Sequence, residues 1–338
     1  MQKKKIAIIG VGGRTGTMFC QELKNVADVF CIGMEAEIEI IKQEKLFIQR
    51  NSVEPEEFKG NLIKSAEFLE NDFVPDIIFL CVKNPICEAV KFYYRKVKKK
   101  GVALPALVIS QNGLFAIEDA KNSLIEVLGS KEAEKVKIIR MVLFNPIDGK
   151  DVNGKICMSY FLPIKMGFGK ISGEGDINNI VEIFKEAKFE ATQFNGKDVR
   201  NMEYSKLFLN LIGMASASRS ISVKNGFKNK EFFKDEVMAL QEYIKVVYSS
   251  KGNFVSFPHY PVKFLVFLFS YFPFCILSFL RGRLAKAITK NREGKSKDLG
   301  EIEYYNGAVI KLGREIGIET PKNKEIYKKV QAKLGKHF

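Results

Sequence analysis

The sequence lacks tryptophan and has only two histidines and six cysteines. The two histidines, His259 and His337, are too few and too far apart to form a zinc site. The cysteines are scattered, at positions 20, 31, 81, 87, 157 and 275, and none lies in a C-x-x-C pair. We therefore expect no metal and a cytoplasmic protein with reduced thiols. The lysines at 3–5 lead straight into a strand pattern, so we expect no signal peptide.

A long uninterrupted membrane-spanning segment is also missing from the pattern. The apolar run 264–280 carries no charge over 17 residues, which is the lower limit for a span, and Pro273 interrupts it. We expect two short helices here, buried in a core or at an interface between the copies of a homodimer. The alternative is attachment to an anionic membrane surface, because the run is rich in phenylalanine and flanked by Lys263 and Arg281.

The 54 lysines and arginines outnumber the 39 aspartates and glutamates, and the formal net charge is +15. The lysines are spread along the chain, and basic runs such as KVKKK at 96–100 are short. Because no aromatic-rich binding motif accompanies them, we expect a solvated basic surface and no nucleic-acid partner.

The first half of the chain shows short, fully apolar runs separated by helical lengths. These runs are at 6–9, 28–33, 75–83, 106–113 and 135–144. This pattern predicts an α/β fold, a Rossmann-type parallel sheet with helices on both faces. Ligands of such sheets bind at the carboxyl ends of the strands, where Gly10, Lys83 and Asn112 fall.

The second half changes character from about residue 197. Apolar residues recur at helical spacing over 197–220, and the tail from Lys297 to Lys333 is helical in pattern with a break near 319–323. The sequence therefore predicts two domains, a dinucleotide-binding domain over 1–195 and an all-helical substrate and dimerisation domain over 196–338.

The stretch GVGGRTG, residues 10–16, follows the first predicted strand. Gly10 would form the tight turn of a dinucleotide-binding loop, and Gly12 would let the backbone approach a pyrophosphate. The third position of the G-x-G-x-x-G pattern is Thr15, with a glycine one residue later at Gly16. The pattern alone is weak evidence, so the rest of the chain has to decide.

Several further motifs occur together with this loop. They are CVK at 81–83, QNG at 111–113, YSKLFLN at 204–210, EIEYYNG at 301–307 and GIETPKN at 317–323. In this combination the chain resembles the ketopantoate reductase family (2-dehydropantoate 2-reductases) over about residues 5–330. The resemblance implies NADPH-dependent reduction of a 2-oxo acid in pantothenate biosynthesis. It also implies a helical domain like that of 6-phosphogluconate dehydrogenase.

The resemblance assigns roles to individual residues. Lys206 matches the catalytic lysine, Asn210 a substrate-binding asparagine, and Glu301 the acid that holds the substrate hydroxyl. Lys83 and Asn112 match residues beside the cofactor. The chemistry agrees, because ketone reduction builds negative charge on oxygen, which an ammonium group stabilises and protonates.

Two substrate-binding positions depart from the family pattern. Met214 stands where a second asparagine is expected, and Thr289 falls about where the family has a serine. We expect a small 2-oxo acid substrate, with 2-dehydropantoate as the family's own. The alternatives are a related dehydrogenase acting on a different 2-oxo acid and a non-catalytic, cofactor-binding, membrane-associated relative.

Cofactor choice depends on residues in and after the loop. Gly13, Arg14 and Thr15 complete the predicted cofactor-binding set, and Arg14 would reach a phosphate. The resemblance implies NADP. NAD remains the alternative, because Glu35 stands about 20 residues past the glycines, where an acid binds the ribose hydroxyl of NAD.

Overall fold

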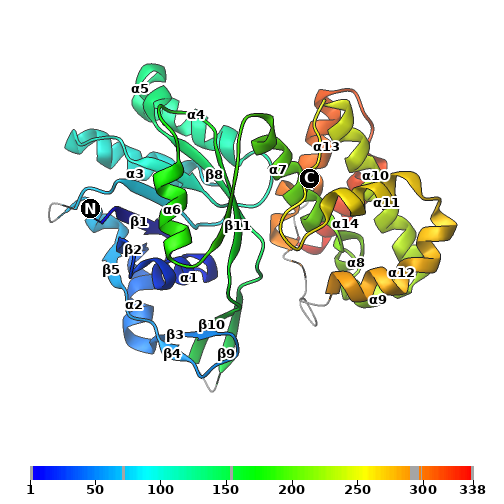
Figure 1. Ribbon diagram of the computed structural model, residues 1–338, viewed down its shortest axis with the longest axis horizontal. Helices are drawn as coiled ribbons and strands as arrows, with labels where there is room; N and C mark the ends of the chain where they lie inside the picture. Colours follow the sequence, from blue (N-terminus) through cyan, green and yellow to red (C-terminus); the bar gives the residue numbers. More distant parts are fainter. Residues whose placement is uncertain (1–2, 71–72, 153–154, 290–296, 298, 336–338) are drawn as a thin grey trace. The chain divides into compact units, whose positions relative to one another are not determined.

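The chain forms two compact units in the computed structural model, which describes all residues except 1–2, 71–72, 153–154, 290–296, 298 and 336–338 (Figure 1). The first unit comprises Met1–Gln111 and Ala116–Val199, and the second comprises Asn112–Phe115 and Arg200–Phe338. The structure divides after Val199, four residues beyond the division that the sequence suggests. Each unit is described by itself.

The first unit is built on an eight-stranded sheet in the order β12-β11-β8-β7-β6-β1-β2-β5. The strands are β1 (Lys5–Ile9), β2 (Asp28–Gly33), β5 (Asn61–Lys64), β6 (Ile77–Leu80), β7 (Ala106–Ile109), β8 (Ile138–Leu143), β11 (Lys165–Lys170) and β12 (Glu190–Phe194). All neighbours pair in parallel except β11 with β8, which are antiparallel. The predicted fold class is confirmed, with this one antiparallel pair as an addition.

Helices cover both faces of this sheet. They are α1 (Arg14–Leu23), α2 (Glu35–Glu44), the short 3-10 helix η1 (Ser65–Glu67), α3 (Cys87–Lys100), α4 (Ala116–Leu128), α5 (Ser130–Lys135) and α6 (Asn178–Glu186). Side chains alternate along β1, so Ile6 and Ile8 pack into one buried cluster and Ala7 and Ile9 into the other. Burial on both faces explains why the strands appear in the sequence as continuous apolar runs.

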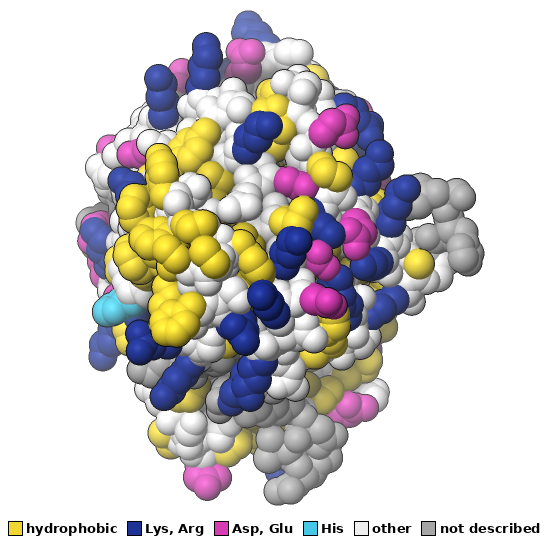
Figure 2. Space-filling model, turned by 90° about the vertical axis from the view of Figure 1, so that its right-hand side faces the viewer, with side chains coloured by type: hydrophobic (Ala, Val, Ile, Leu, Met, Phe, Trp, Pro, Cys, Tyr) yellow, Lys and Arg dark blue, Asp and Glu magenta, His cyan; other side chains and the backbone are white. Residues whose placement is uncertain are grey.

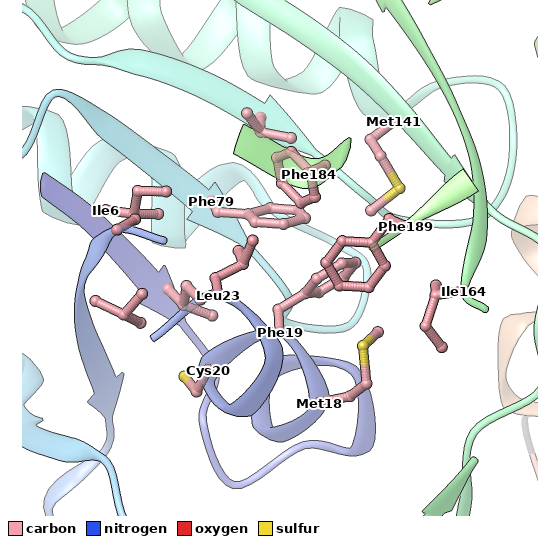
Figure 3. Packing of buried hydrophobic residues seen from close by; sticks show 14 of the residues in the cluster. Ile6, Met18, Phe19, Cys20, Leu23, Phe79, Met141, Ile164, Phe184 and Phe189 are labelled. Atoms are coloured by element: carbon pink, nitrogen blue, oxygen red, sulfur yellow. The ribbon is translucent and has the colours of Figure 1, made fainter. Parts of the chain in front are cut away.

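Aromatic rings fill the cluster between the sheet and α1 and α6. Figure 3 shows Phe19 of α1 beside Phe79 of β6, with Phe184 and Phe189 close by. The ring centroids of Phe19 and Phe79 lie 4.6 Å apart, and those of Phe79 and Phe184 5.8 Å apart. Tilted and edge-on contacts of this kind add to the hydrophobic gain from burying the rings.

A small second sheet, absent from our sequence prediction, has the order β4-β3-β10-β9. Its strands are β3 (Leu46–Arg50), β4 (Glu56–Glu57), β9 (Asp148–Val152) and β10 (Lys155–Tyr160). Strands β4 and β9 are polar in sequence. They therefore lack the continuous apolar run by which the strands of the main sheet are predicted.

The glycine turn after β1 brings helix α1 very close to the strand end. Gly10 has a φ of +97°, which favours glycine. A Cβ on Gly16 would lie 2.0 Å from the carbonyl oxygen of Gly10. Gly16 is thus the residue that permits close packing of helix and strand, so the glycine displaced by one position still performs the third glycine's task.

The second unit is helical. Its elements are α7 (Lys197–Leu211), α8 (Met214–Ala217), α9 (Val223–Lys228), α10 (Lys230–Ser249), α11 (Val262–Tyr271), α12 (Phe274–Thr289), the 3-10 helix η2 (Leu299–Tyr304), α13 (Asn306–Glu315) and α14 (Pro321–Lys333). The tail breaks between α13 and α14 at residues 316–320, next to the predicted break. Gly213, with a φ of +95°, separates α7 from α8.

The apolar run 264–280 forms parts of two helices separated at Pro273, as predicted. Only one side of each helix is buried within the unit, so burial of the other side at an interface between copies stays a prediction. Val266 and Phe269 of α11 are buried, whereas Phe264 and Tyr271 are exposed. None of the helices in the described part of the chain combines the length and the apolar character that crossing a membrane requires.

We predict that Gly16→Ala and Gly282→Ala have opposite effects on stability. Alanine in a helix interior is ordinarily favoured over glycine by about 1 kcal/mol, and the Cβ position of Gly282 in α12 is open. At Gly16 the new methyl group meets the Gly10 carbonyl, so we expect a loss of about 1–3 kcal/mol. Urea unfolding followed by circular dichroism measures both. Equal stability of the two variants would contradict the close approach.

Candidate active site

Helix α7 carries Lys206 and Asn210 among its buried polar side chains. Lys206 is 9% exposed and Asn210 is 7% exposed, and Leu207 and Phe208 beside them are buried. Residues four apart lie on the same side of a helix, so Lys206 and Asn210 project together. A lysine is seldom buried to this extent without a specific reason, which supports a role beyond surface charge.

A chain of hydrogen bonds connects Asn210 to Glu301, although the two are far apart in sequence. Asn210 Nδ2 donates to Asn112 Oδ1 at 3.2 Å, and Asn112 Nδ2 donates to Glu301 Oε2 at 3.1 Å. The hydroxyl of Tyr305 donates to the same carboxylate oxygen at 2.6 Å. Three of the predicted site residues are therefore in direct contact, all within the second unit. Tyr305 was not predicted, although it follows Glu301 by one helical turn in the EIEYYNG motif.

Gln111 and Gly113 hold Asn112 in this position from either side. Gln111 Nε2 donates to the carbonyls of Leu80 and Val82, at 3.1 Å and 2.8 Å. Gly113 has a φ of +93°, and a Cβ there would lie 2.7 Å from Cβ of Tyr304. Each residue of the QNG motif thus has a separate structural task, and glycine is required where the chain passes Tyr304.

A buried arginine that sequence reasoning missed supports the same turn. Arg140 of β8 is 1% exposed, and its guanidinium donates to the carbonyls of Ile109 at 3.0 Å and Gln111 at 2.6 Å. Burial of this charge is tolerated because backbone carbonyls accept its hydrogen bonds. The available signal was a lone charged residue inside the apolar run KIIRMVL.

Met214 begins α8, where a buried carboxylate fixes the backbone. Glu236 of α10 is 1% exposed and accepts hydrogen bonds from the amides of Gly213 and, at 3.2 Å, Ala215. Burial raises the pKa of Glu236 to about 7, while the Gly213 amide and the Lys297 ammonium act in the opposite direction. Met214 itself is 1% exposed.

Lys297 adds a second ammonium group near Asn210. Its Nζ donates to the backbone carbonyl of Asn210 at 2.7 Å, and its Cε would lie 3.4 Å from a Cβ on Gly213. Sequence reasoning did not select this lysine, because it stands in a polar segment with no pattern around it. Thr289 is the last residue of α12, and its side chain lies outside the described part of the structure.

The predicted cofactor loop lies in the first unit. Gly10, Gly12 and Gly13 form the turn, and α1 begins at Arg14 without a side-chain cap on its N-terminus. Free backbone amides at a helix N-terminus attract phosphate groups, so the turn fits a dinucleotide. Thr15 lies in the first turn of α1, and the Arg14 guanidinium donates to the carbonyl of Ile147 at 3.4 Å.

Lys83 is exposed and stands three residues after β6, at the carboxyl end of a strand that neighbours β1. This is the edge of the sheet at which Gly10 also lies. The structure therefore places Lys83 where a cofactor-binding residue of a parallel sheet is expected.

Comparisons with known proteins agree with this arrangement. The family model described as "Ketopantoate reductase PanE/ApbA" matches residues 6–138, and the model described as "Ketopantoate reductase PanE/ApbA C terminal" matches residues 295–334. The chain belongs to the ketopantoate reductase family. A curated relative, the 2-dehydropantoate 2-reductase of Pyrobaculum aerophilum, is 38% identical over 56 residues, a match that spans 20% of that protein and 15% of this chain.

Solved structures show the same fold over nearly the whole chain. A PanE/ApbA family ketopantoate reductase from Ralstonia eutropha has a TM-score of 0.70 at 15% identity, covering 97% of both chains. D-mandelate dehydrogenase in a ternary structure with NADH and anilino(oxo)acetate also has a TM-score of 0.70, at 18% identity, covering 97% of this chain and 98% of the other. At such identities the likeness establishes the fold.

We predict that the Glu236 carboxyl makes the stability of this family member fall as pH rises. Its pKa is about 7 in the folded state, against an ordinary value of 4.5. Between these values the unfolded state binds fewer protons, so the free energy of unfolding decreases with rising pH and levels off above about pH 7. Glu236→Gln should remove this decrease, on the order of 2–3 kcal/mol.

Urea unfolding of the wild type and of Glu236→Gln at about pH 5 and pH 8 checks this expectation. The exposed Glu315→Gln variant serves as the control, because it removes a carboxylate without affecting α8. A wild-type-to-variant difference that is the same at both pH values would show that Glu236 ionises normally in the folded protein.

Proposed function

We propose that the protein reduces a 2-oxo acid to the corresponding 2-hydroxy acid with a reduced nicotinamide cofactor. The observation that carries this proposal is the hydrogen-bonded set Asn210, Asn112 and Glu301 beside the buried Lys206. Under this proposal residues 1–195 form the cofactor domain and residues 196–338 the substrate domain, which forms the interface if the protein dimerises.

When bound, the reduced nicotinamide supplies a hydride to the carbonyl carbon of the substrate. Lys206 stabilises the negative charge that develops on the carbonyl oxygen and supplies the proton. Asn210 retains hydrogen-bonding capacity toward the substrate, and Glu301 accepts a hydroxyl of the substrate. The two donors from Asn112 and Tyr305 orient the Glu301 carboxylate for this task.

The choice among 2-oxo acids depends on Met214, which follows Asn210 by four residues in the sequence. Met214 replaces an amide with an apolar side chain, which favours a 2-oxo acid with a more apolar substituent than 2-dehydropantoate carries. The complex of D-mandelate dehydrogenase with anilino(oxo)acetate supports including aryl 2-oxo acids among the candidates. 2-Dehydropantoate remains the reference substrate, because the curated relative is a 2-dehydropantoate 2-reductase.

Two acidic residues of α2 differ in their position relative to the glycine loop. The Glu37 carboxylate lies beside the glycine loop, 3.2 Å from the Cβ position of Gly12, and accepts the Met34 amide at 2.9 Å. Glu35 instead pairs with Lys64 at 2.7 Å. Glu37, rather than the Glu35 selected from the sequence, is therefore the carboxylate placed to accept a ribose hydroxyl.

The surroundings of Glu37 support NADH over NADPH. A 2′-phosphate would be repelled by the carboxylate, whereas the ribose hydroxyls of NADH donate to it. Lys64 is held by Glu35 and, at 3.0 Å, by Glu39, and the contact with Lys64 lowers the pKa of Glu39. The family resemblance implies NADPH, whereas the position of Glu37 favours NADH. Measurements of the affinity for each cofactor distinguish the two expectations.

We predict that Lys206→Ala loses at least about a hundredfold in kcat, because the lost ammonium acts mainly in the transition state. Steady-state assays with 2-dehydropantoate, 2-oxoisovalerate and phenylglyoxylate, followed by cofactor absorbance, measure the loss. Cofactor affinity should change little, since the residue contacts the substrate oxygen. The exposed Lys324→Ala variant is the control. A wild-type kcat in Lys206→Ala would reject this assignment.

We predict that the wild type binds NADH more tightly than NADPH. The Glu37→Gln variant should lower the ratio of the NADPH dissociation constant to the NADH dissociation constant at least about tenfold. Glutamine keeps an acceptor for the Met34 amide but removes the charge. The fluorescence of the reduced nicotinamide reports the binding of either cofactor. Glu39→Gln, on the same helix, should leave the ratio unchanged. Tighter NADPH binding by the wild type would reject the role of Glu37, and binding of neither cofactor would reject the proposed function.

A further inference from the structure

Helices α11 and α12 present a group of exposed hydrophobic side chains, here called the aromatic face. Its members are Phe264 (57% exposed), Phe267 (49%), Tyr271 (74%), Ile276 (41%) and Phe279 (82%). The space-filling view in Figure 2 shows hydrophobic side chains gathered on this side of the molecule, with Lys and Arg along the border. A group of large apolar side chains that stays exposed to water is typical of an interaction site, because its contact with water is unfavourable unless a partner covers it.

Helical spacing explains how the face forms. Phe264, Phe267 and Tyr271 are separated by three and four residues, which places them on one side of α11. Val262, Val266 and Phe269 on the other side are buried against the rest of the unit. The inner side of the helix therefore packs in the core of the unit. The phenylalanines of the outer side take no part in that packing.

The segment that carries the aromatic face has basic residues and no acidic ones. The sequence contains no Asp or Glu between Glu242 and Glu293, a stretch with eight Lys and Arg residues. Arg283 and Lys286 follow Phe279 by four and seven residues on α12, so they continue the same helical side, and both are exposed. Lys263 precedes Phe264 and is also exposed. Aromatic groups with exposed Lys263, Arg283 and Lys286 beside them complement a surface that is apolar inside and anionic at its border.

We propose that the aromatic face docks the protein on an anionic lipid bilayer. The phenylalanines would enter the boundary between headgroups and acyl chains, and the cations would meet the lipid phosphates. Helix α11 has 10 residues and is therefore about 15 Å long, half of a hydrocarbon core, so it lies along the surface. A second copy is a poorer occupant, because a two-fold interface would bring the two cationic borders together.

Vesicle sedimentation of the full chain tests the proposal. We expect binding to phosphatidylcholine vesicles with roughly one third phosphatidylglycerol, weaker binding at high salt, and little binding to phosphatidylcholine alone. The double variant Phe267→Ser, Phe279→Ser should lose at least about tenfold in vesicle affinity. Arg283→Glu with Lys286→Glu should lose binding to the anionic vesicles as well.

The matched control is Phe161→Ser, which removes a phenylalanine that is 60% exposed in the first unit. It should bind vesicles like the wild type. Circular dichroism and cofactor fluorescence establish that every variant is folded. Failure of the wild type to bind anionic vesicles would overturn the proposal, as would equal binding to neutral ones. If light scattering showed a dimer that the Phe267→Ser, Phe279→Ser variant converts to a monomer, the face would be an interface between copies instead.

Discussion

The turn after β7 is the constraint on which the candidate site depends. Arg140 holds the carbonyl of Gln111 from inside the sheet, and the side chain of Gln111 binds the carbonyls that end β6. With this backbone fixed, the next residue, Asn112, presents its amide to both Asn210 and Glu301. An amide suits this position, because it donates to one neighbour and accepts from the other.

This arrangement also explains why buried polar groups persist in an apolar helical unit. Asn210 and Lys206 are both buried, and burial of unpaired polar groups is costly. The hydrogen bond that Asn210 donates to Asn112 offsets that cost for Asn210. The same reasoning applies to Glu236, whose carboxylate is retained because backbone amides of Gly213 and Ala215 donate to it.

Family membership and individual side chains contribute different information about function. The family models and the fold give the chemistry, whereas Met214, Lys297 and Glu37 are properties of this chain. Each of these three changes what the surrounding site can bind: an apolar group in place of an amide, a second ammonium beside Asn210, and a carboxylate beside Gly12. Under the proposed function, the choice of cofactor and substrate therefore depends on residues outside the motifs that identify the family.

The sequence by itself determined the α/β and helical halves, because strands buried on both faces and helices with one apolar side leave clear periodic patterns. It also located Lys206, Asn210 and Glu301 through their motifs. Only the tertiary structure placed Asn112 between Asn210 and Glu301, brought Glu37 beside Gly12, and left Phe279 exposed. Such choices depend on which side chains meet in space, and local periodicity carries no information about contacts between distant segments.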